Sequence, residues 1–203
     1  LGTLCARAVV GMKADSVTAP RILVLASGSG TNLQALIDAS RERDFPGQIV
    51  AVGCNRPGAF ALERAAQANI DTFTVDHTHY GSREEFDGAL MAEIRRHNPD
   101  LIVLAGFMRI LTTDFVRALR GTMLNVHPSL LPKYTGLNTH QRALDAGETT
   151  HGVSIHFVTE ELDGGPVIAQ AEVSISSDDT PESLAEKVQE KEHVLYPIVV
   201  RWF

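Results

Sequence analysis

Short apolar strand patterns alternate with helical patterns along the chain as far as His127, and this alternation is the strongest constraint on the fold. Strands separated by helices form βαβ units, in which parallel strands are joined by right-handed crossovers. The chain is therefore predicted to adopt an α/β fold with a mainly parallel sheet and helices on both faces. The expected strands are 22–26, 49–53, 72–75, 101–106 and 123–127, and the expected helices between them are 33–39, 59–68, 84–96 and 113–119.

The pattern changes after Asn138, where a helix is expected to run to about residue 146. Residues 153–158 alternate between apolar and polar side chains, which is typical of a half-exposed or antiparallel strand. An acidic loop at 159–166, a strand at 167–175 and a final helix from Pro181 follow. The second half is therefore expected to extend the sheet with antiparallel strands and to form the wall of a cleft.

Two helix starts carry capping signals. Ser82 followed by Glu85 has the spacing of a capping box, and Thr113 or Asp114 is available to cap the helix that ends near Gly121. Because such side chains satisfy N–H groups of the first helical turn, these residues predict where the two helices begin.

Composition limits the classes of protein to which the chain can belong. With 203 residues, 44% of them hydrophobic and 21% charged, it can form one sizeable core, so a single domain is expected over 21–203 after a flexible extension at 1–20. A net charge of −7 without a long run of Lys or Arg argues against a nucleic-acid partner, and no apolar stretch approaches the roughly 20 residues that span a bilayer. Two cysteines, Cys5 and Cys54, are too few for a disulfide framework and lack metal-site spacing, which favours a cytoplasmic protein that binds no metal.

A glycine-rich turn follows the first expected strand, with the sequence SGSGTN at 27–32. Glycines allow a ligand to approach the backbone closely, and the helix that follows offers unpaired N–H groups, so the turn can hold a phosphate; an ordinary strand-to-helix turn is the alternative. Leu33 replaces the third glycine of a dinucleotide fingerprint, and the second strand ends at 53–55 without an acidic residue for a ribose. A phosphate monoester is therefore a better ligand than a nicotinamide dinucleotide.

Asn125 and His127 lie two residues apart at the end of an expected strand. Residues at this spacing point to the same side of a strand, so the amide and the imidazole can converge on one reacting atom and stabilise an oxyanion. A pair of structural hydrogen-bonding residues is the plainer alternative. Pro128 and Pro132 end the strand here, and the strand ends of open α/β sheets are where ligands bind, which favours a functional role.

Two further segments are candidates for the same site. Residues 108–111 follow an apolar strand and can form a slot for a flat heterocycle, or simply pack against the core. Asp163 lies in an acidic loop that would ordinarily be a solvated turn. If this carboxylate lies beside His127, it favours the imidazolium cation, which suits a proton donor near neutral pH.

The motifs together resemble the phosphoribosylglycinamide formyltransferases, which move a formyl group from 10-formyltetrahydrofolate to the amine of glycinamide ribonucleotide in purine biosynthesis. The resemblance runs from about Arg21 to Phe203 and rests on SGSGTNLQA at 27–35, AGFMRIL at 105–111, NVHPSLLPKY at 125–134 and HFVTEELDGGPVI at 156–168. It implies a Rossmann-like formyltransferase fold with a phosphate-binding half at about 21–122 and a catalytic, folate-binding half at 123–203. It also implies a catalytic trio of Asn125, His127 and Asp163.

The resemblance further implies which residues bind the two substrates. The substrate phosphate and ribose are expected on Ser29, Gly30, Thr31, Asn32, Gln189 and Glu192, and the folate on Arg83, Met108, Arg109, Ile110, Leu111 and Asn125. The expected partners are these small molecules, without a metal, a nucleic acid or a membrane, and a homodimer is left open. Thr135 and Asn138 stand where some members of the family have Pro and His, and Asn at the latter position also occurs in relatives.

Other functions share parts of this pattern. A methionyl-tRNA formyltransferase is expected to have an additional C-terminal domain and a more basic face, and a formyltetrahydrofolate hydrolase a regulatory module before the catalytic half. A binding module that only senses phosphate and folate is expected to have lost Asn125, His127 or Asp163, and all three are present. Glycinamide ribonucleotide is therefore the expected formyl acceptor.

Overall fold

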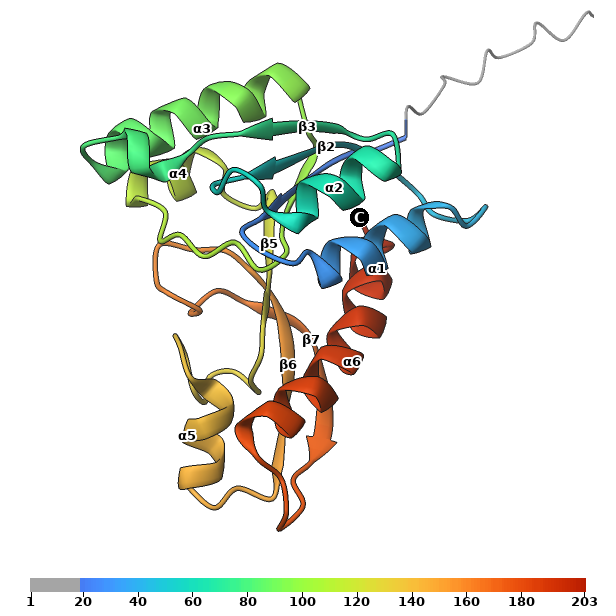
Figure 1. Ribbon diagram of the computed structural model, residues 1–203, viewed down its shortest axis with the longest axis vertical. Coiled ribbons are helices and arrows are strands. Elements are labelled where there is room, and N and C mark those ends of the chain that lie inside the picture. Colours follow the sequence, from blue (N-terminus) through green and yellow to red (C-terminus); the bar gives the residue numbers. More distant parts are fainter. Residues whose placement is uncertain (1–18) are drawn as a thin grey trace, which may run out of the picture.

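A computed structural model describes residues 19–203, which form one seven-stranded sheet with the order β3-β2-β1-β4-β5-β6-β7 (Figure 1). The first five strands in this order are mutually parallel, whereas β6 is antiparallel to β5 and β7 is antiparallel to β6. The predicted α/β fold with an antiparallel extension is confirmed. The strands are β1 (Arg21–Ala26), β2 (Gln48–Cys54), β3 (Asp71–Thr74), β4 (Leu101–Leu104), β5 (Met123–His127), β6 (Thr150–Phe157) and β7 (Val167–Ser174).

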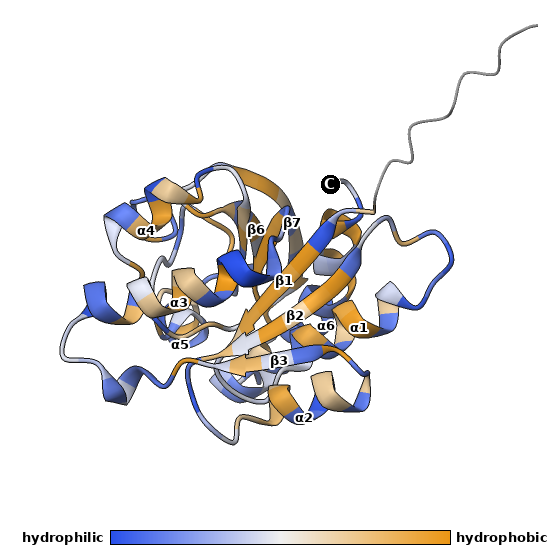
Figure 2. Cartoon of the chain, turned by 90° about the horizontal axis from the view of Figure 1, so that it is seen from above, coloured by the Kyte–Doolittle hydropathy of each residue, from blue (hydrophilic) through white to orange (hydrophobic). Residues whose placement is uncertain are grey.

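Helices cover both faces of the sheet, as Figure 2 shows in a view from above. One face carries α1 (Thr31–Ser40), α2 (Phe60–Gln67) and α6 (Pro181–Val200), and the other carries α3 (Arg83–His97) and α4 (Thr113–Ala118). The helix α5 (Thr139–Asp145) and the short 3-10 helix η1 (His77–His79) complete the elements. No helix within residues 19–203 combines the length and the apolar character needed to cross a membrane.

The central strand β1 shows how the two faces are filled. Ile22, Val24 and Ala26 pack toward α1 and α6, whereas Leu23 and Leu25 pack toward α3, and none of the five is more than 2% exposed. Successive side chains of a strand point to opposite faces, so a fully apolar run can serve two cores at once. Burial of each of the four larger side chains, those of residues 22–25, stabilises the fold by about 1.5–3 kcal/mol.

The strand order reverses beside β1, whose two neighbours are β2 and β4. Chain segments that leave the carboxyl ends of β1 and β4 run to opposite faces of the sheet, which opens a crevice between them. Tyr196 of α6 ties this helix to β4 and β5, because its buried hydroxyl lies 3.1 Å from the carbonyl oxygens of both Leu104 and Leu124. The fold thus places a crevice where β1, β4 and β5 end.

The alternating strand predicted at 153–158 was expected to be half-exposed or antiparallel, and the structure has the antiparallel arrangement with a buried strand. Residues 151–156 of β6 are all buried, because β6 lies between β5 and β7 and is covered on both faces. Its polar side chains have partners: the Ser154 hydroxyl donates to the Ser129 carbonyl at 2.6 Å and accepts from the Leu131 nitrogen at 3.0 Å. Register pairs Asn125 with His156, which brings β6 into the region of the expected site.

Several predicted boundaries shift locally. Thr112, rather than Thr113 or Asp114, caps α4, since its hydroxyl accepts from the Phe115 nitrogen at 3.3 Å. Only half of the predicted capping box forms: the Ser82 hydroxyl accepts from the Glu85 nitrogen, while the Glu85 carboxylate accepts from the Gly81 nitrogen. The expected extension at 1–20 lies outside the described residues except for residues 19 and 20, of which Pro20 accepts a backbone hydrogen bond from Gln48.

Candidate active site

A cavity of about 310 Å³ opens at the carboxyl ends of β1, β4 and β5. A volume of this size is at the lower end of the range of small-molecule sites. Its lining comes from the glycine-rich turn, from the segment after β4, from the end of β5 and from α6. All six residues that were expected to bind the substrate line it: Ser29, Gly30, Thr31, Asn32, Gln189 and Glu192.

Gly30 gives the turn its shape. It adopts a left-handed conformation with φ 70°, and a Cβ atom here would lie 2.8 Å from Ala61 of α2, so no other residue fits without displacing that helix. Gly30 is also the N-cap of α1, and no side chain caps the first helical turn. The N–H groups of that turn and the positive end of the helix dipole are therefore available to an anion.

Glu192 crosses from α6 to the same turn. Its Oε2 atom accepts from Asn32 Nδ2 at 2.7 Å, and the residue is only 8% exposed. Burial raises the pKa of the Glu192 carboxyl, and the hydrogen bond from Asn32 partly opposes that shift. The Asn32 Oδ1 atom is buried without a partner among the described residues, and beside it Gln189 donates to the Thr31 hydroxyl at 3.1 Å. These polar groups suit a ligand that carries hydroxyl groups.

Ser27 connects the glycine-rich turn to the segment after β4. Its buried hydroxyl accepts from the Met108 nitrogen at 2.7 Å and donates to Asn55 Oδ1. Met108 and Ile110 are 61% and 56% exposed, so they are not packed into the core. The expected apolar slot therefore begins at the rim of the cavity, of which Met108 is part.

The start of α3 lies beside this segment. Arg109 stacks over the Phe86 ring at 5.6 Å from the ring centre, and the buried Asp87 carboxylate accepts from the Thr112 nitrogen at 2.6 Å. Arg83 is exposed at the first turn of the same helix. The Arg109 Nε atom is buried without a partner among the described residues. Two arginines thus lie near an exposed apolar strip, an arrangement suited to a flat ligand with an anionic end.

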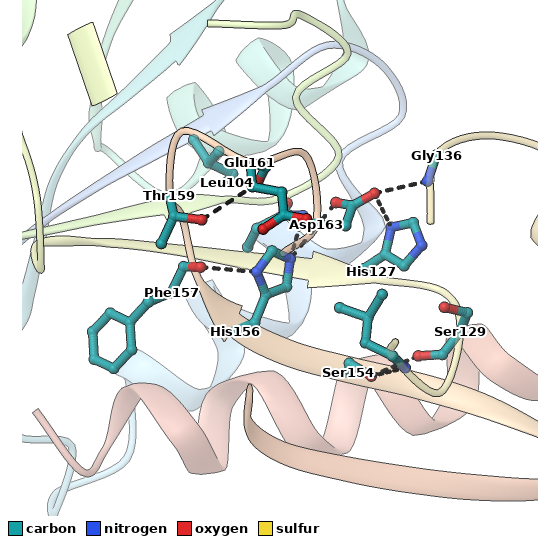
Figure 3. Close-up of polar contacts among 12 residues, drawn as sticks. Leu104, His127, Ser129, Gly136, Ser154, His156, Phe157, Thr159, Glu161 and Asp163 are labelled. Atoms are coloured by element: carbon teal, nitrogen blue, oxygen red, sulfur yellow. Dashed lines mark hydrogen bonds and ion pairs between the residues drawn. The ribbon is translucent and has the colours of Figure 1, made fainter. Parts of the chain in front are cut away.

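His127 and Asp163 meet near the end of β5, as Figure 3 shows. Asp163 Oδ2 lies 3.4 Å from His127 Nδ1, and the side chains are 8% and 7% exposed. The same oxygen accepts from the Gly136 nitrogen at 2.8 Å, and Asp163 adopts a left-handed conformation with φ 52°. The acidic loop thus turns its carboxylate inward, against the imidazole, rather than toward water.

His156 lies between Asn125 and Asp163. Its Nδ1 atom donates to the Phe157 carbonyl at 2.9 Å, while its Nε2 atom lies 3.1 Å from Asn125 Nδ2 and 3.8 Å from Asp163 Oδ1. Burial lowers the pKa of His156, although the Phe157 carbonyl and the Asp163 charge oppose this shift. A neutral ring with its proton on Nδ1 accepts one N–H of the Asn125 amide and leaves the other N–H free. His156 therefore orients Asn125.

The segment after β5 closes over His127. The His127 Nε2 atom donates to the Tyr134 carbonyl at 2.9 Å. Since Asp163 lies at Nδ1, both ring nitrogens of His127 face acceptors. Tyr134 adopts φ 57°, and its hydroxyl donates to Glu148 at 2.8 Å, which also holds the Lys133 ammonium at 2.7 Å. The Tyr134 carbonyl oxygen thus points toward the imidazole.

The structure brings the expected residues into two adjoining groups, one around the glycine-rich turn and one around His127. The cavity joins them through Val126 and Pro128, which flank His127 in the chain. Sequence patterns did not reveal Arg56, which lines the cavity, or the linking role of Ser27. Both depend on which strands are neighbours, and that order is not readable from strand patterns alone. Within residues 19–203, no group of three or more His, Cys, Asp or Glu side chains is arranged to hold a metal ion.

Comparisons with known proteins agree with this architecture. The family model described as formyl transferase matches residues 20–200. A phosphoribosylglycinamide formyltransferase from Escherichia coli (strain K12) is 52% identical over 182 residues, which cover 90% of this chain and 86% of the relative. Solved phosphoribosylglycinamide formyltransferases from Coxiella burnetii and Brucella melitensis are 53% and 42% identical, with TM-scores of 0.86 and 0.87. The matches cover 91% and 92% of this chain and 86% and 96% of the two structures.

Proposed function

The chain belongs to the formyl transferase family, and we propose that it transfers the formyl group of 10-formyltetrahydrofolate directly to the amine of glycinamide ribonucleotide, a step of purine biosynthesis. The observation that carries the proposal is the pairing of His127 with Asp163 beside a cavity that ends in an uncapped helix. The pair of His127 and Asp163 supports acyl transfer, and the uncapped start of α1 supports a substrate that carries a phosphate.

Glycinamide ribonucleotide binds with its phosphate on the first turn of α1. The N–H groups after Gly30 and the hydroxyl of Thr31 donate to the phosphate oxygens. Glu192 and Asn32 accept from the ribose hydroxyls, since each has an acceptor oxygen beside the cavity. This orientation directs the glycinamide amine away from the turn and toward His127.

The folate binds along Met108, Arg109, Ile110 and Leu111, with its ring system over the exposed apolar side chains. Arg83 lies at the exposed start of α3, where it can pair with the anionic tail of the folate. The formyl group then enters the site between Asn125 and His127. Both substrates lie in one crevice, and this proximity supplies much of the acceleration.

In the chemical step the amine lone pair attacks the formyl carbon, and the carbonyl electrons move to oxygen. The free N–H of Asn125 and the imidazolium of His127 donate to this oxyanion. The tetrahedral intermediate collapses, the bond from carbon to the folate nitrogen breaks, and that nitrogen takes up a proton as the amine loses one. His127 or a water carries the proton, while Asp163 orients the imidazole through its contact with Nδ1.

One hydrogen bond must exchange before this step. The Nε2–H of His127 is donated to the Tyr134 carbonyl, so it reaches the oxyanion only when that carbonyl gives way. Tyr134 lies in an exposed turn held by Glu148, and its displacement leaves the sheet intact. Binding of the formyl oxygen at the position of this carbonyl oxygen therefore replaces one acceptor by another.

The proposal extends to the organisation of the protein. The half at about 21–122 supplies the phosphate turn and the half at 123–203 supplies the catalytic trio, with α6 returning Gln189 and Glu192 to the phosphate. A single domain over 21–203 is consistent with the continuous sheet. A cytoplasmic location is proposed from the low cysteine content of the sequence.

The function is tested with the purified protein, 10-formyltetrahydrofolate and glycinamide ribonucleotide, with formylated product identified by mass spectrometry. Formylation of the amine is expected, together with negligible release of formate when the acceptor is omitted. Parallel reactions with methionyl-tRNA as the acceptor probe the competing transferase activity. Rapid formate release without an acceptor, preference for the tRNA, or folate binding without turnover would each contradict the proposal.

A further inference from the structure

Arg56 follows the carboxyl end of β2 directly and lines the cavity together with the glycine-rich turn. Its position is fixed by its neighbour Asn55, which is 1% exposed. The Asn55 side chain accepts from the Ser27 hydroxyl, and its carbonyl accepts from His77 Nδ1 at 2.7 Å. Arg56 therefore emerges from a backbone that is tied to the turn after β1.

The two turns also touch through their backbones. The Ala61 nitrogen at the start of α2 donates to the Gly28 carbonyl at 3.1 Å, so the loop that carries Arg56 runs beside the glycine-rich turn (Figure 1). Gly30 packs against the same part of α2. These contacts leave little freedom for one loop to move away from the other.

The charges around the cavity are unbalanced for a phosphate. Arg56 and Glu192 are the only charged side chains among the described residues that line it, and the remaining lining groups are neutral. The nearby Arg64 is already engaged, since it donates to the Ser29 carbonyl at 2.8 Å and to Gln34 at 3.0 Å. Arg56 is exposed, and within residues 19–203 its guanidinium forms neither a hydrogen bond nor an ion pair, while its carbonyl accepts from the Ala59 nitrogen. It is thus a free cation beside an uncapped helix start.

A phosphate monoester carries close to two negative charges near neutral pH. The helix start supplies about half a charge, and the Glu192 carboxylate opposes the anion, so neutral donors alone leave the phosphate undercompensated. From this juxtaposition we propose that Arg56 is the cationic phosphate ligand of the site and selects the 5′-phosphorylated substrate over the unphosphorylated one. This inference rests on the proposed function and adds a residue and a basis of selectivity to it.

The planar guanidinium of Arg56 can donate two parallel hydrogen bonds to the phosphate oxygens that face away from α1, which a lysine cannot do. Because Arg56 is exposed, it also attracts the anion from solution, and this attraction weakens as salt screens the charge. Loss of Arg56 is therefore expected to raise KM and to flatten the salt dependence of kcat/KM.

The test compares glycinamide ribonucleotide with its 5′-dephosphorylated analogue as acceptors for the wild type and for Arg56→Ala, Arg56→Lys and Arg43→Ala. Arg43 is an exposed arginine outside the cavity and serves as a matched control. For Arg56→Ala, kcat/KM for the phosphorylated acceptor is expected to fall about 10- to 100-fold, the range for a charge-assisted hydrogen bond. For the dephosphorylated acceptor it is expected to fall no more than in Arg43→Ala, and Arg56→Lys is expected to recover part of the loss.

Equal losses on both acceptors would overturn the inference, because the phosphate would then not be the group that Arg56 contacts. An unchanged kcat/KM for the phosphorylated acceptor would overturn it as well. Turnover of the dephosphorylated acceptor reports that the catalytic residues remain folded and active. Failure of the proposed function has a different signature, since the wild type itself would then not formylate the phosphorylated acceptor.

Discussion

Asp163 Oδ2 lies 3.4 Å from His127 Nδ1, and the same oxygen accepts a hydrogen bond from the Gly136 nitrogen. One carboxylate oxygen therefore connects the end of β5, the loop before β7 and the segment that closes over the imidazole. The second oxygen lies 3.8 Å from His156, which in turn accepts from Asn125. The carboxylate thus contacts one catalytic candidate directly and reaches the other through His156.

Replacement of Asn125 by Ala removes the amide that is proposed to hold the oxyanion. Loss of one such donor typically lowers kcat by about 10²- to 10³-fold. KM for glycinamide ribonucleotide is expected to stay nearly constant, because its phosphate and ribose are proposed to bind at the glycine-rich turn and α6, and Asn125 does not line that cavity. Steady-state kinetics with both substrates varied separates the two constants. A large rise in KM with an unchanged kcat would assign Asn125 to ground-state binding instead.

His156 acts through Asn125, so its replacement is expected to have a smaller effect. His156→Phe removes the acceptor for the Asn125 amide and is expected to lower kcat about tenfold, the worth of one neutral hydrogen bond. His156→Gln retains a side-chain acceptor and is expected to recover most of that rate. The two variants are compared by kcat and by thermal unfolding. An equally low rate in both, with unchanged stability, would argue against an orienting role.

Acid is expected to destabilise the fold through a buried histidine. Burial lowers the pKa of His151 to about 4, assisted by the neighbouring His140. The unfolded chain takes up a proton at His151 below about pH 6.5, whereas the folded chain does so only near pH 4, so stability falls as pH falls between these values. From pH 7.5 to pH 5 the free energy of unfolding is expected to drop by about 2 kcal/mol from this residue.

Urea unfolding of the wild type, His151→Gln and His79→Gln at the two pH values measures this loss. His79 is a suitable control because its side chain is 76% exposed. The His151 variant is expected to lose less stability on acidification than the other two proteins. Parallel losses in all three would show that the acid sensitivity arises elsewhere.

Tyr196 links the core to the site. Its hydroxyl lies 3.1 Å from the carbonyl oxygens of Leu104 and Leu124, the residues that precede the turn after β4 and Asn125. Tyr196→Phe leaves buried carbonyl oxygens without this donor and is expected to lower the free energy of unfolding by about 1–3 kcal/mol. Tyr80→Phe is a control in which no hydrogen bond of the hydroxyl is lost within residues 19–203. Denaturant unfolding that gives the same midpoint for both variants would contradict the assignment.

Much of the fold could be predicted from the sequence because strands that serve two cores are apolar throughout, as in 22–26, and alternate with helical patterns along the chain. The burial of β6 could not be read from its alternating pattern, which left a half-exposed and an antiparallel strand open. Its polar residues Ser154 and His156 resemble an exposed face in the sequence, but they are buried and hydrogen bonded between two strands. A single strand carries no information on what covers its second face.

The site was less predictable than the fold. The spacing of Asn125 and His127 identified a candidate pair locally, and the proximity of Asp163 depended on a loop whose left-handed turn no pattern specified. The roles of these residues stay predictions. Arg56 escaped notice because an arginine after a strand is ordinary, and its meaning depends on β2 lying beside β1.

Single-turnover kinetics of Asp163→Asn, with both substrates saturating and pH varied from 5 to 9, test the central claim most directly. An asparagine retains the shape and an acceptor for the Gly136 nitrogen but loses the charge beside His127. Formyl transfer is expected to slow by about 10²-fold or more near neutral pH, because the negative charge beside His127 is lost while the shape of the side chain is kept. Transfer at the wild-type rate across this pH range would contradict the proposed cooperation of His127 and Asp163.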